Sequence, residues 1–309
     1  MMIMAATAKK GKYRGRFAPS PTGPLHFGSL VAAVGSFLDA RSHGGEWLVR
    51  IDDLDPPRAV PGAAETILET LESCGMKWDG PVVYQGARTE AYHAALHRLR
   101  ELGLVYACAC SRREIADIAM AGAEGPVYPG TCRAGIAPGR VARAQRVNTN
   151  GARIEFDDAL QGRIAHDIGR DFGDFVVYRA DGVYAYQLAV VVDDAEQGIT
   201  DVVRGADLLA STPRQIYLQQ LLGLPRPRYA HLPVAVNAAG EKLSKQTSAA
   251  PVDAANPVPA LSAALSFLGQ QPPAALAQDT IKSLWDWAIS NWRLSRVPRF
   301  AAAPAPVLP

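Results

Sequence analysis

Hydrophobic positions in the first hundred residues follow two periods in turn. A short apolar and basic stretch before Phe17 can pair as a strand, and residues 27–40 carry apolar side chains at helical spacing. The continuous apolar run 47–51 predicts a buried strand, whereas 63–74 and 92–99 predict two further helices, each with a glycine soon after it. Strands that alternate with helices in this way are typical of a parallel α/β sheet.

The regular pattern weakens between residues 106 and 168, where Gly, Pro, Arg and Cys dominate, and we interpret this segment as an insertion. Order returns with a predicted strand at 175–178. The apolar run 188–192 gives the strongest indication of a buried strand in the chain, and it ends in Asp193 and Asp194.

The last third of the chain is predicted to be mainly helical. A capping threonine and a first-turn proline begin a predicted helix over 212–222. Two more helices are predicted at 258–268 and 281–292, and the Pro/Ala-rich tail 298–309 is predicted to be disordered. A chain of 309 residues exceeds the usual size of one domain, so we expect two or three.

Composition narrows the functional class. Apolar residues make up 48% of the chain and the formal net charge is only +2, which argues against a large basic surface that wraps nucleic acid. No run approaches the ~20 apolar residues that span a bilayer, so no membrane association is expected. The N-terminus is apolar before it is basic, the reverse of a secretory signal, and the cysteine pattern suits a reducing compartment. We therefore expect a cytoplasmic protein.

Residues 16–29 form the first candidate site, with the sequence RFAPSPTGPLHFGS. Its prolines and Gly23 hold an irregular turn just before a predicted helix, whose free amide groups favour an anionic ligand. His26 can donate a hydrogen bond to phosphate. The tetrapeptide from His26 to Ser29 alone would fit an ordinary strand-to-helix turn with a surface histidine, but the whole string favours a functional site.

The second candidate site is the run Lys242-Leu243-Ser244-Lys245-Gln246. A lysine is a mobile point charge that can follow the charge developing on phosphate in a transition state. Taken alone, the run would fit an ordinary charged loop. Together with residues 16–29 it indicates a pocket for a nucleoside triphosphate.

Three of the four cysteines crowd into the insertion, at Cys108, Cys110 and Cys132. Three thiolates at this density suit tetrahedral zinc, with Tyr128 or His166 as candidates for the fourth ligand. The competing interpretation is three reduced cysteines packed inside a small insert.

The two candidate sites resemble the signatures of class I aminoacyl-tRNA synthetases, within the glutamyl branch. Residues 16–23 and the string GITDVVRG at 198–205 carry the resemblance, which covers about residues 13–246. It implies a Rossmann-like parallel-sheet catalytic domain split by a zinc-containing insertion and followed by a small helical C-terminal region. The implied divisions are 13–105 and 169–247 for the two catalytic halves, 106–168 for the insertion, 248–297 for the helical region and 298–309 for the tail.

The resemblance also implies roles for individual residues. His26 and Lys245 act in catalysis and, with Gly28 and Lys242, bind ATP, which brings Mg²⁺. An insertion of CxC…Y…C pattern in a truncated branch of the family matches a structural zinc site at Cys108, Cys110, Tyr128 and Cys132. Arg204 corresponds to an arginine that holds the substrate carboxylate. Asp52 replaces a family glutamate that meets the substrate ammonium, so its charge is kept but its reach is shorter. The implied glutamate contacts are Arg16, Phe17, Ala18, Pro19, Ser20, Asp52, Tyr186 and Arg204.

The implied reaction has two steps. The carboxylate of L-glutamate attacks the α-phosphate of ATP to give glutamyl-adenylate and pyrophosphate, and the glutamyl group then passes to a nucleic-acid hydroxyl. Residues 246–309 are few for the helical anticodon-binding region of ordinary bacterial members. The chain therefore resembles the truncated branch, which glutamylates the queuosine base in the anticodon of tRNA(Asp), and we expect a monomer. The alternatives are a compact glutamyl-tRNA synthetase that charges a tRNA 3′ end and a non-catalytic tRNA-binding paralogue.

Overall fold

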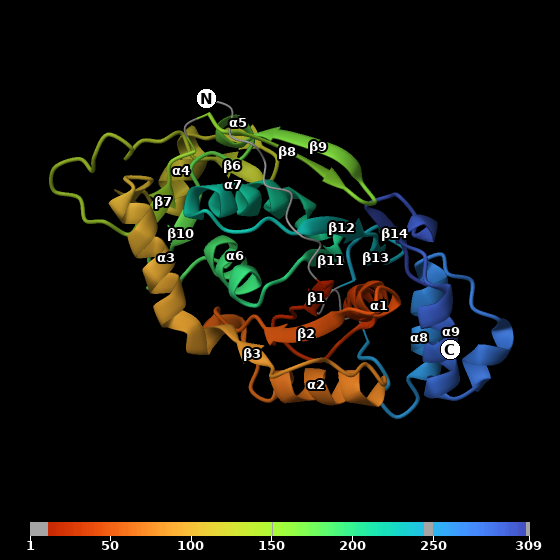
Figure 1. Ribbon diagram of the computed structural model, residues 1–309. Helices are drawn as coiled ribbons and strands as arrows, with labels where there is room; N and C mark the ends of the chain where they lie inside the picture. Colours follow the sequence, from red (N-terminus) through yellow and green to blue (C-terminus); the bar gives the residue numbers. More distant parts are fainter. Residues whose placement is uncertain (1–11, 150, 244–249, 307–309) are drawn as a thin grey trace.

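A computed structural model describes residues 12–149, 151–243 and 250–306. The first part of the chain alternates strand and helix as the hydrophobic pattern predicts (Figure 1). Strands β1, β2 and β3 pair in parallel in that order, with Arg14 opposite Glu46 and Arg50 opposite Val83. The elements are β1 (Arg14–Phe17), α1 (Phe27–Ser42), β2 (Glu46–Ile51), α2 (Ala63–Ser73), β3 (Val83–Tyr84) and α3 (Thr89–Glu101).

A second set of strands continues this sheet. Strand β11 (Asp201–Gly205) pairs in parallel with β12 (Arg228–Leu232), and α7 (Thr212–Leu222) connects them as predicted. The backbone amide of Thr200, just before β11, donates to the carbonyl of Arg14 at 2.9 Å, so β11 lies beside β1. The carboxyl ends of β1 and β11 therefore meet at one edge.

The run 188–192 is helical, and the strand predicted there is wrong. It lies in α6 (Tyr186–Glu196), where every residue from Gln187 to Asp194 is buried. A continuous apolar run fits a fully buried helix as well as a buried strand, because neither leaves a polar face to reveal its period. Helices α3 and α7 pack against α6.

The insertion shares a small antiparallel sheet with the strands on either side of it, and it gives two further strands to the sheet of β11 and β12. The small sheet has the order β10-β7-β4, and β10 holds the predicted strand 175–178. Strands β8 and β9 fall within the predicted insertion, yet Tyr229 of β12 lies opposite Asp158 of β8, so they extend the sheet of β11 and β12. The elements are β4 (Val105–Cys108), α4 (Arg112–Ile118), β5 (Met120–Gly122), β6 (Gly125–Val127), β7 (Ala144–Val147), β8 (Arg153–Asp158), β9 (Gly162–Asp167), α5 (Ile168–Asp171) and β10 (Val176–Tyr178).

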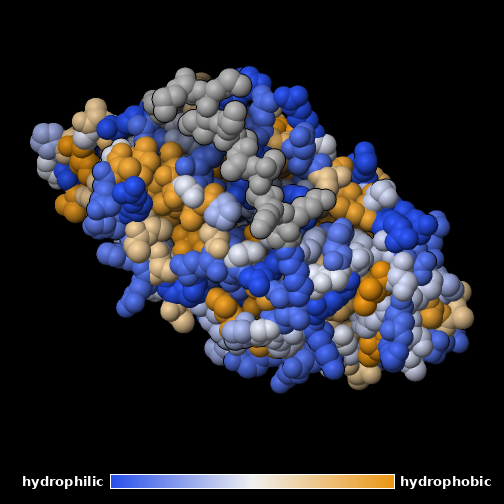
Figure 2. All heavy atoms as spheres, in the orientation of Figure 1, coloured by the Kyte–Doolittle hydropathy of each residue, from blue (hydrophilic) through white to orange (hydrophobic). Residues whose placement is uncertain are grey.

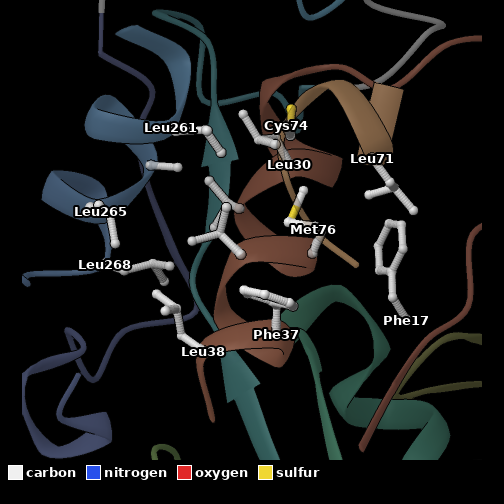
Figure 3. Close-up of a cluster of buried hydrophobic side chains, with 14 of the residues drawn as sticks. Phe17, Leu30, Phe37, Leu38, Leu71, Cys74, Met76, Leu261, Leu265 and Leu268 are labelled. Atoms are coloured by element: carbon white, nitrogen blue, oxygen red, sulfur yellow. The ribbon is translucent and has the colours of Figure 1, made fainter. Parts of the chain in front are cut away.

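The two predicted C-terminal helices form α8 (Val258–Phe267) and α9 (Ile281–Asn291), and both pack on α1 (Figure 1). Figure 3 shows the shared core, in which Leu261 and Leu265 of α8 face Leu30 and Leu38 of α1. The tail expected to be disordered is described to residue 306. Its strand β14 (Ala302–Pro304) pairs with β13 (Val234–Val236).

Tryptophans attach α9 to the first half of the chain through hydrogen bonds as well as packing. The indole of Trp285 donates to the carbonyl of Cys74 at 2.8 Å, and the indole of Trp292 donates to Asp39 at 3.0 Å. Figure 2 shows hydrophilic residues over much of one face, with smaller apolar patches between them. Among the described helices, none is both long and apolar enough to cross a membrane.

Candidate active site

A cavity of about 650 Å³ opens where β1, β11 and β12 end. The carboxyl edge of a parallel sheet is where α/β folds bind ligands, because loops and helix starts converge there. Ten predicted residues line this cavity, and Asp52 lines a small neighbouring one with Ser20 and Thr22. Lys245 lies outside the described residues. The ten are Arg16, Phe17, Ala18, Pro19, Ser20, His26, Gly28, Tyr186, Arg204 and Lys242.

His26 caps the helix that starts at the cavity. Its Nδ1 accepts the backbone amide of Ser29 at 3.3 Å, and the Ser29 hydroxyl accepts the His26 amide at 2.8 Å. Because Nδ1 is an acceptor, the proton of the neutral ring is on Nε2. A Cβ on Gly28 would come within 3.3 Å of the Leu243 carbonyl. Glycine therefore leaves room for the chain that follows β13 to approach the start of α1.

Lys242 also lines the cavity. Its ammonium group is 2.5 Å from the carboxylate of Asp207, and both residues line the cavity. Both side chains are partly exposed, so this pair holds the lysine at the rim and contributes little to stability. Asp207 is a site residue that sequence analysis missed.

Arg204 lies at the end of β11 among neutral partners, which we call the Arg204 shell: Tyr186, Thr212, Gln215 and His231. Its Nη2 donates to Thr212 Oγ1 at 2.7 Å and Gln215 Oε1 at 2.8 Å, and its Nε donates to His231 Nε2 at 3.1 Å. Nη1 is 3.5 Å from the hydroxyl of Tyr186. Arg204 is only 5% exposed, and no carboxylate of the described chain forms an ion pair with it. A buried cation without a counter-ion, on a cavity wall, is suited to an anionic ligand.

Arg16 has a different environment, although it lines the same cavity. Its guanidinium pairs with Asp194 at 3.2 Å, and Arg50 Nη1 reaches the same carboxylate at 2.7 Å. Arg50 also pairs with Asp52 at 2.9 Å and lies 3.7 Å from Asp193. We call these five residues the aspartate–arginine cluster. Burial opposes ionisation of Asp194, but the two guanidinium groups lower its pKa below its ordinary value.

Asp52 therefore faces Arg50 and is not in the lining of the larger cavity. Burial raises the pKa of its carboxyl to about 6, and the charge and hydrogen bond of Arg50 offset only part of that effect. Asp194, which sequence analysis missed as a site residue, is the acidic group that meets Arg16. The signal available for it was an acidic pair directly after a long apolar run.

The cysteines of the insertion lie together. The Sγ atoms of Cys108, Cys110 and Cys132 are all within 4.8 Å of one another, and those of Cys110 and Cys132 are 3.6 Å apart. Ligands about 2.3 Å from a tetrahedral zinc would be about 3.8 Å apart, so the cluster has the spacing of a metal site rather than a disulfide. Burial raises the pKa of Cys132, but the Tyr128 hydroxyl, the Ala109 amide and the two other thiols outweigh it and lower that pKa to about 7.

The Tyr128 hydroxyl lies 3.4 Å from the Cys108 sulfur and 3.6 Å from that of Cys110, where a fourth ligand would be. His166 is not part of the group: its Nδ1 lies 2.8 Å from Asp171. Of the two candidates for the fourth ligand, the arrangement thus brings only Tyr128 to the thiols.

Three comparisons with known proteins agree with this geometry. The family described as "tRNA synthetases class I (E and Q), catalytic domain" matches residues 12–258. A glutamyl-Q tRNA(Asp) synthetase of Aromatoleum aromaticum is 62% identical over 95% of this chain and 93% of its own, and one of Dechloromonas aromatica is 61% identical over 93% and 96%. A glutamate tRNA ligase from Elizabethkingia meningosepticum, solved in complex with its amino acid, superposes with a TM-score of 0.78 at 26% identity and covers 96% of this chain and 68% of its own. The chain belongs to the class I tRNA synthetases of the glutamate and glutamine family.

Proposed function

We propose that this enzyme activates L-glutamate with ATP and transfers the glutamyl group to the queuosine base in the anticodon of tRNA(Asp). The observation that carries the first step is the buried guanidinium of Arg204, which lines the cavity and whose hydrogen-bond partners among the described residues are all neutral. A glutamate carboxylate there would supply the missing negative charge, whereas a glutamine amide would not.

In the first step, an oxygen of the substrate carboxylate attacks the α-phosphorus of ATP, and the bond to the β-phosphate oxygen breaks to release pyrophosphate. The Nε2 proton of His26, the start of α1 and the ammonium of Lys242 lie around the cavity where phosphate charge would develop. We assign Lys245 the same task and expect Mg²⁺ to accompany ATP. Catalysis then rests on positioning and electrostatics, with no protein nucleophile.

The residues that we propose to contact glutamate line or border the same cavity. Arg16 and Arg204 line the cavity from β1 and β11, and Tyr186 at the start of α6 lies beside Arg204. Phe17, Ala18, Pro19 and Ser20 form the wall that follows β1. We keep Asp52 as the group for the substrate ammonium, since Ser20 and Thr22 border both its small cavity and the larger one.

The choice of acceptor rests on the relatives. Identity is 62% to a glutamyl-Q tRNA(Asp) synthetase across nearly all of both chains, but 26% to a glutamate tRNA ligase. We therefore favour the anticodon base of tRNA(Asp) over a tRNA 3′ end. We expect a monomer that works in the cytoplasm.

One assay separates the three functions considered. Labelled glutamate and ATP are supplied with queuosine-containing tRNA(Asp) lacking its 3′-terminal adenosine, with an unmodified transcript of that tRNA, and with tRNA(Glu). We expect label only on the queuosine-containing tRNA, because it alone carries the acceptor base. Label on tRNA(Glu) alone would instead identify a compact glutamyl-tRNA synthetase. Absence of glutamate-dependent ATP–pyrophosphate exchange would identify a non-catalytic paralogue.

We further propose a structural zinc held by Cys108, Cys110, Tyr128 and Cys132. The backbone amide of Cys132 donates to the Tyr128 oxygen at 2.8 Å, and the Arg146 guanidinium lies 4.0 Å above the phenol ring, which both favour an anionic oxygen. Zinc would supply folding stability, with all four positions filled. Metal analysis should find one zinc per chain and none in Cys110→Ser. Cys74→Ser, whose thiol is in the main core, is the control and should keep its zinc.

A further inference from the structure

Asp158 and His231 lie behind Arg204, and the proposed reaction does not use either of them. Asp158 ends β8, one of the two strands that the insertion contributes, and its Oδ1 accepts the backbone amides of Leu160 at 3.0 Å and Gln161 at 2.9 Å. Its Oδ2 lies 2.6 Å from Nδ1 of His231 on β12. Both side chains are fully buried, so this contact is held rigidly.

This contact fixes how the histidine faces Arg204. An ionised carboxylate can only accept, so His231 Nδ1 carries the proton and Nε2 is an acceptor. Nε2 is the atom that receives the Nε–H of Arg204 at 3.1 Å, and the Thr212 hydroxyl lies 3.0 Å from it. If Nε2 carried a proton instead, two N–H groups would point at each other.

Gln215 also holds the Arg204 guanidinium in one orientation, through Nη2. The amide of Gln215 donates to Gln187 at 2.9 Å, so its oxygen is the atom that faces Arg204. With Nε and Nη2 held in this way, Nη1 is left beside Tyr186 at the cavity wall.

We propose that Asp158 and His231 are positioning residues that hold Arg204 in the orientation that receives the substrate carboxylate, and so set the preference for glutamate over glutamine. The inference rests on the proposed function, since it assumes that glutamate occupies this cavity. It also gives the insertion a part in amino-acid selection, because β8 supplies Asp158.

Two substitutions of His231 separate positioning from simple packing. His231→Asn keeps a donor near Nδ1 but loses the acceptor for Arg204, whereas His231→Gln can place an amide oxygen near the Nε2 position. In ATP–pyrophosphate exchange, we expect His231→Asn to raise the KM for glutamate about tenfold with kcat within threefold, and to reduce the preference for glutamate over glutamine. His231→Gln should recover most of both, and the KM for ATP should stay unchanged in each variant.

Asp158→Asn gives a second test if His231→Asn does not fold. An asparagine can turn its amide toward the ring, which places the ring proton on Nε2, so the KM for glutamate should rise while circular dichroism stays native. An unchanged KM in a folded His231→Asn or Asp158→Asn variant, or equal losses in His231→Asn and His231→Gln, would overturn the positioning role. A wild-type enzyme that charges no substrate at all would instead overturn the proposed function, and glutamate-induced shifts in Tm would then measure the role of His231 directly.

Discussion

Two buried arginine environments lie side by side in this molecule and differ in charge balance. The aspartate–arginine cluster holds Arg16 and Arg50 among three carboxylates, and Arg50 is 0% exposed. The Arg204 shell holds one guanidinium among a phenol, a hydroxyl, an amide and a neutral imidazole. In the first arrangement the arginines have carboxylates of the chain as counter-ions, although Arg16 also lines the cavity, whereas the second gains its counter-ion when an anion binds.

Two buried arginines of the same fold can therefore depend on different partners: Arg50 on carboxylates of the chain, and Arg204 on neutral groups beside the cavity. Paired charges in the aspartate–arginine cluster link β2 to α6, and Asp193 extends the link to Gln85, Arg88 and Tyr92. Breaking a pair there leaves a buried charge uncompensated. In the Arg204 shell, substitution removes a guanidinium that no carboxylate of the described residues pairs with.

The largest effect on stability is expected at Arg50. Arg50→Met should lower the free energy of unfolding by about 3–5 kcal/mol, because Asp52 and Asp194 lose a buried cation. Urea unfolding measures this change. Lys282→Ala is the control, since its ion pair with Asp286 is exposed and is worth less than about 1 kcal/mol. Similar losses in the two variants would remove the distinction between the cluster and a surface pair.

Arg204→Met should lose much of its activity and little of its stability. Glutamate-dependent exchange is expected to fall about a hundredfold to a thousandfold, because the carboxylate loses its charged partner. The free energy of unfolding should fall much less than in Arg50→Met, since a buried guanidinium without a counter-ion is removed. A loss of stability as large as that of Arg50→Met would show that the two environments do not differ in charge balance.

Acid should weaken the Arg204 shell through His231. Burial lowers the pKa of this histidine to about 4, although Asp158 opposes the shift, and the charge of Arg204 lowers it further. Between pH 6.5 and 4 the unfolded chain therefore binds a proton that the folded chain does not. The stability gained from the neutral ring is lost as the pH falls through this window, on the order of 3 kcal/mol. The free energies of unfolding of wild type and His231→Gln, measured at a series of pH values, should converge toward pH 4. A constant difference between them at all pH values would contradict the assignment.

The smallest effect on stability is expected at the cavity rim. Lys242→Ala breaks an ion pair with Asp207 in which both side chains are partly exposed, so the unfolding free energy should change by less than about 1 kcal/mol. The KM for ATP should nevertheless rise, because the variant lacks a cation that we propose to bind the phosphates of ATP. An unchanged KM for ATP would limit the role of this lysine to its pair with Asp207.

Local pattern was enough to predict most elements, whereas most residues of the cavity wall were predicted from the resemblance to class I synthetases. The helix that starts at Phe27, the strands β1 and β2 and the three thiols of the insertion follow from periodicity and spacing. The threonine cap expected for α7 is wrong, because Thr212 is the first residue of that helix and its hydroxyl accepts from Arg204. The prediction failed at 188–192, where a buried helix has no polar face to reveal its period. The strand pairing of residues 302–304 was also missed, since their composition is that of a solvated tail.

The sequence alone, through its motifs and its family resemblance, was enough to predict the candidate side chains: residues 16–29, Arg204, Lys242 and the cysteines of the insertion. Tertiary structure decided which of them are already paired. Arg16 meets Asp194, which is 178 positions away in the chain, and Asp158 reaches Arg204 through His231 because β8 joins β12. Such contacts depend on how the sheets and α6 pack together, and no local period or motif records the partner of a buried charge.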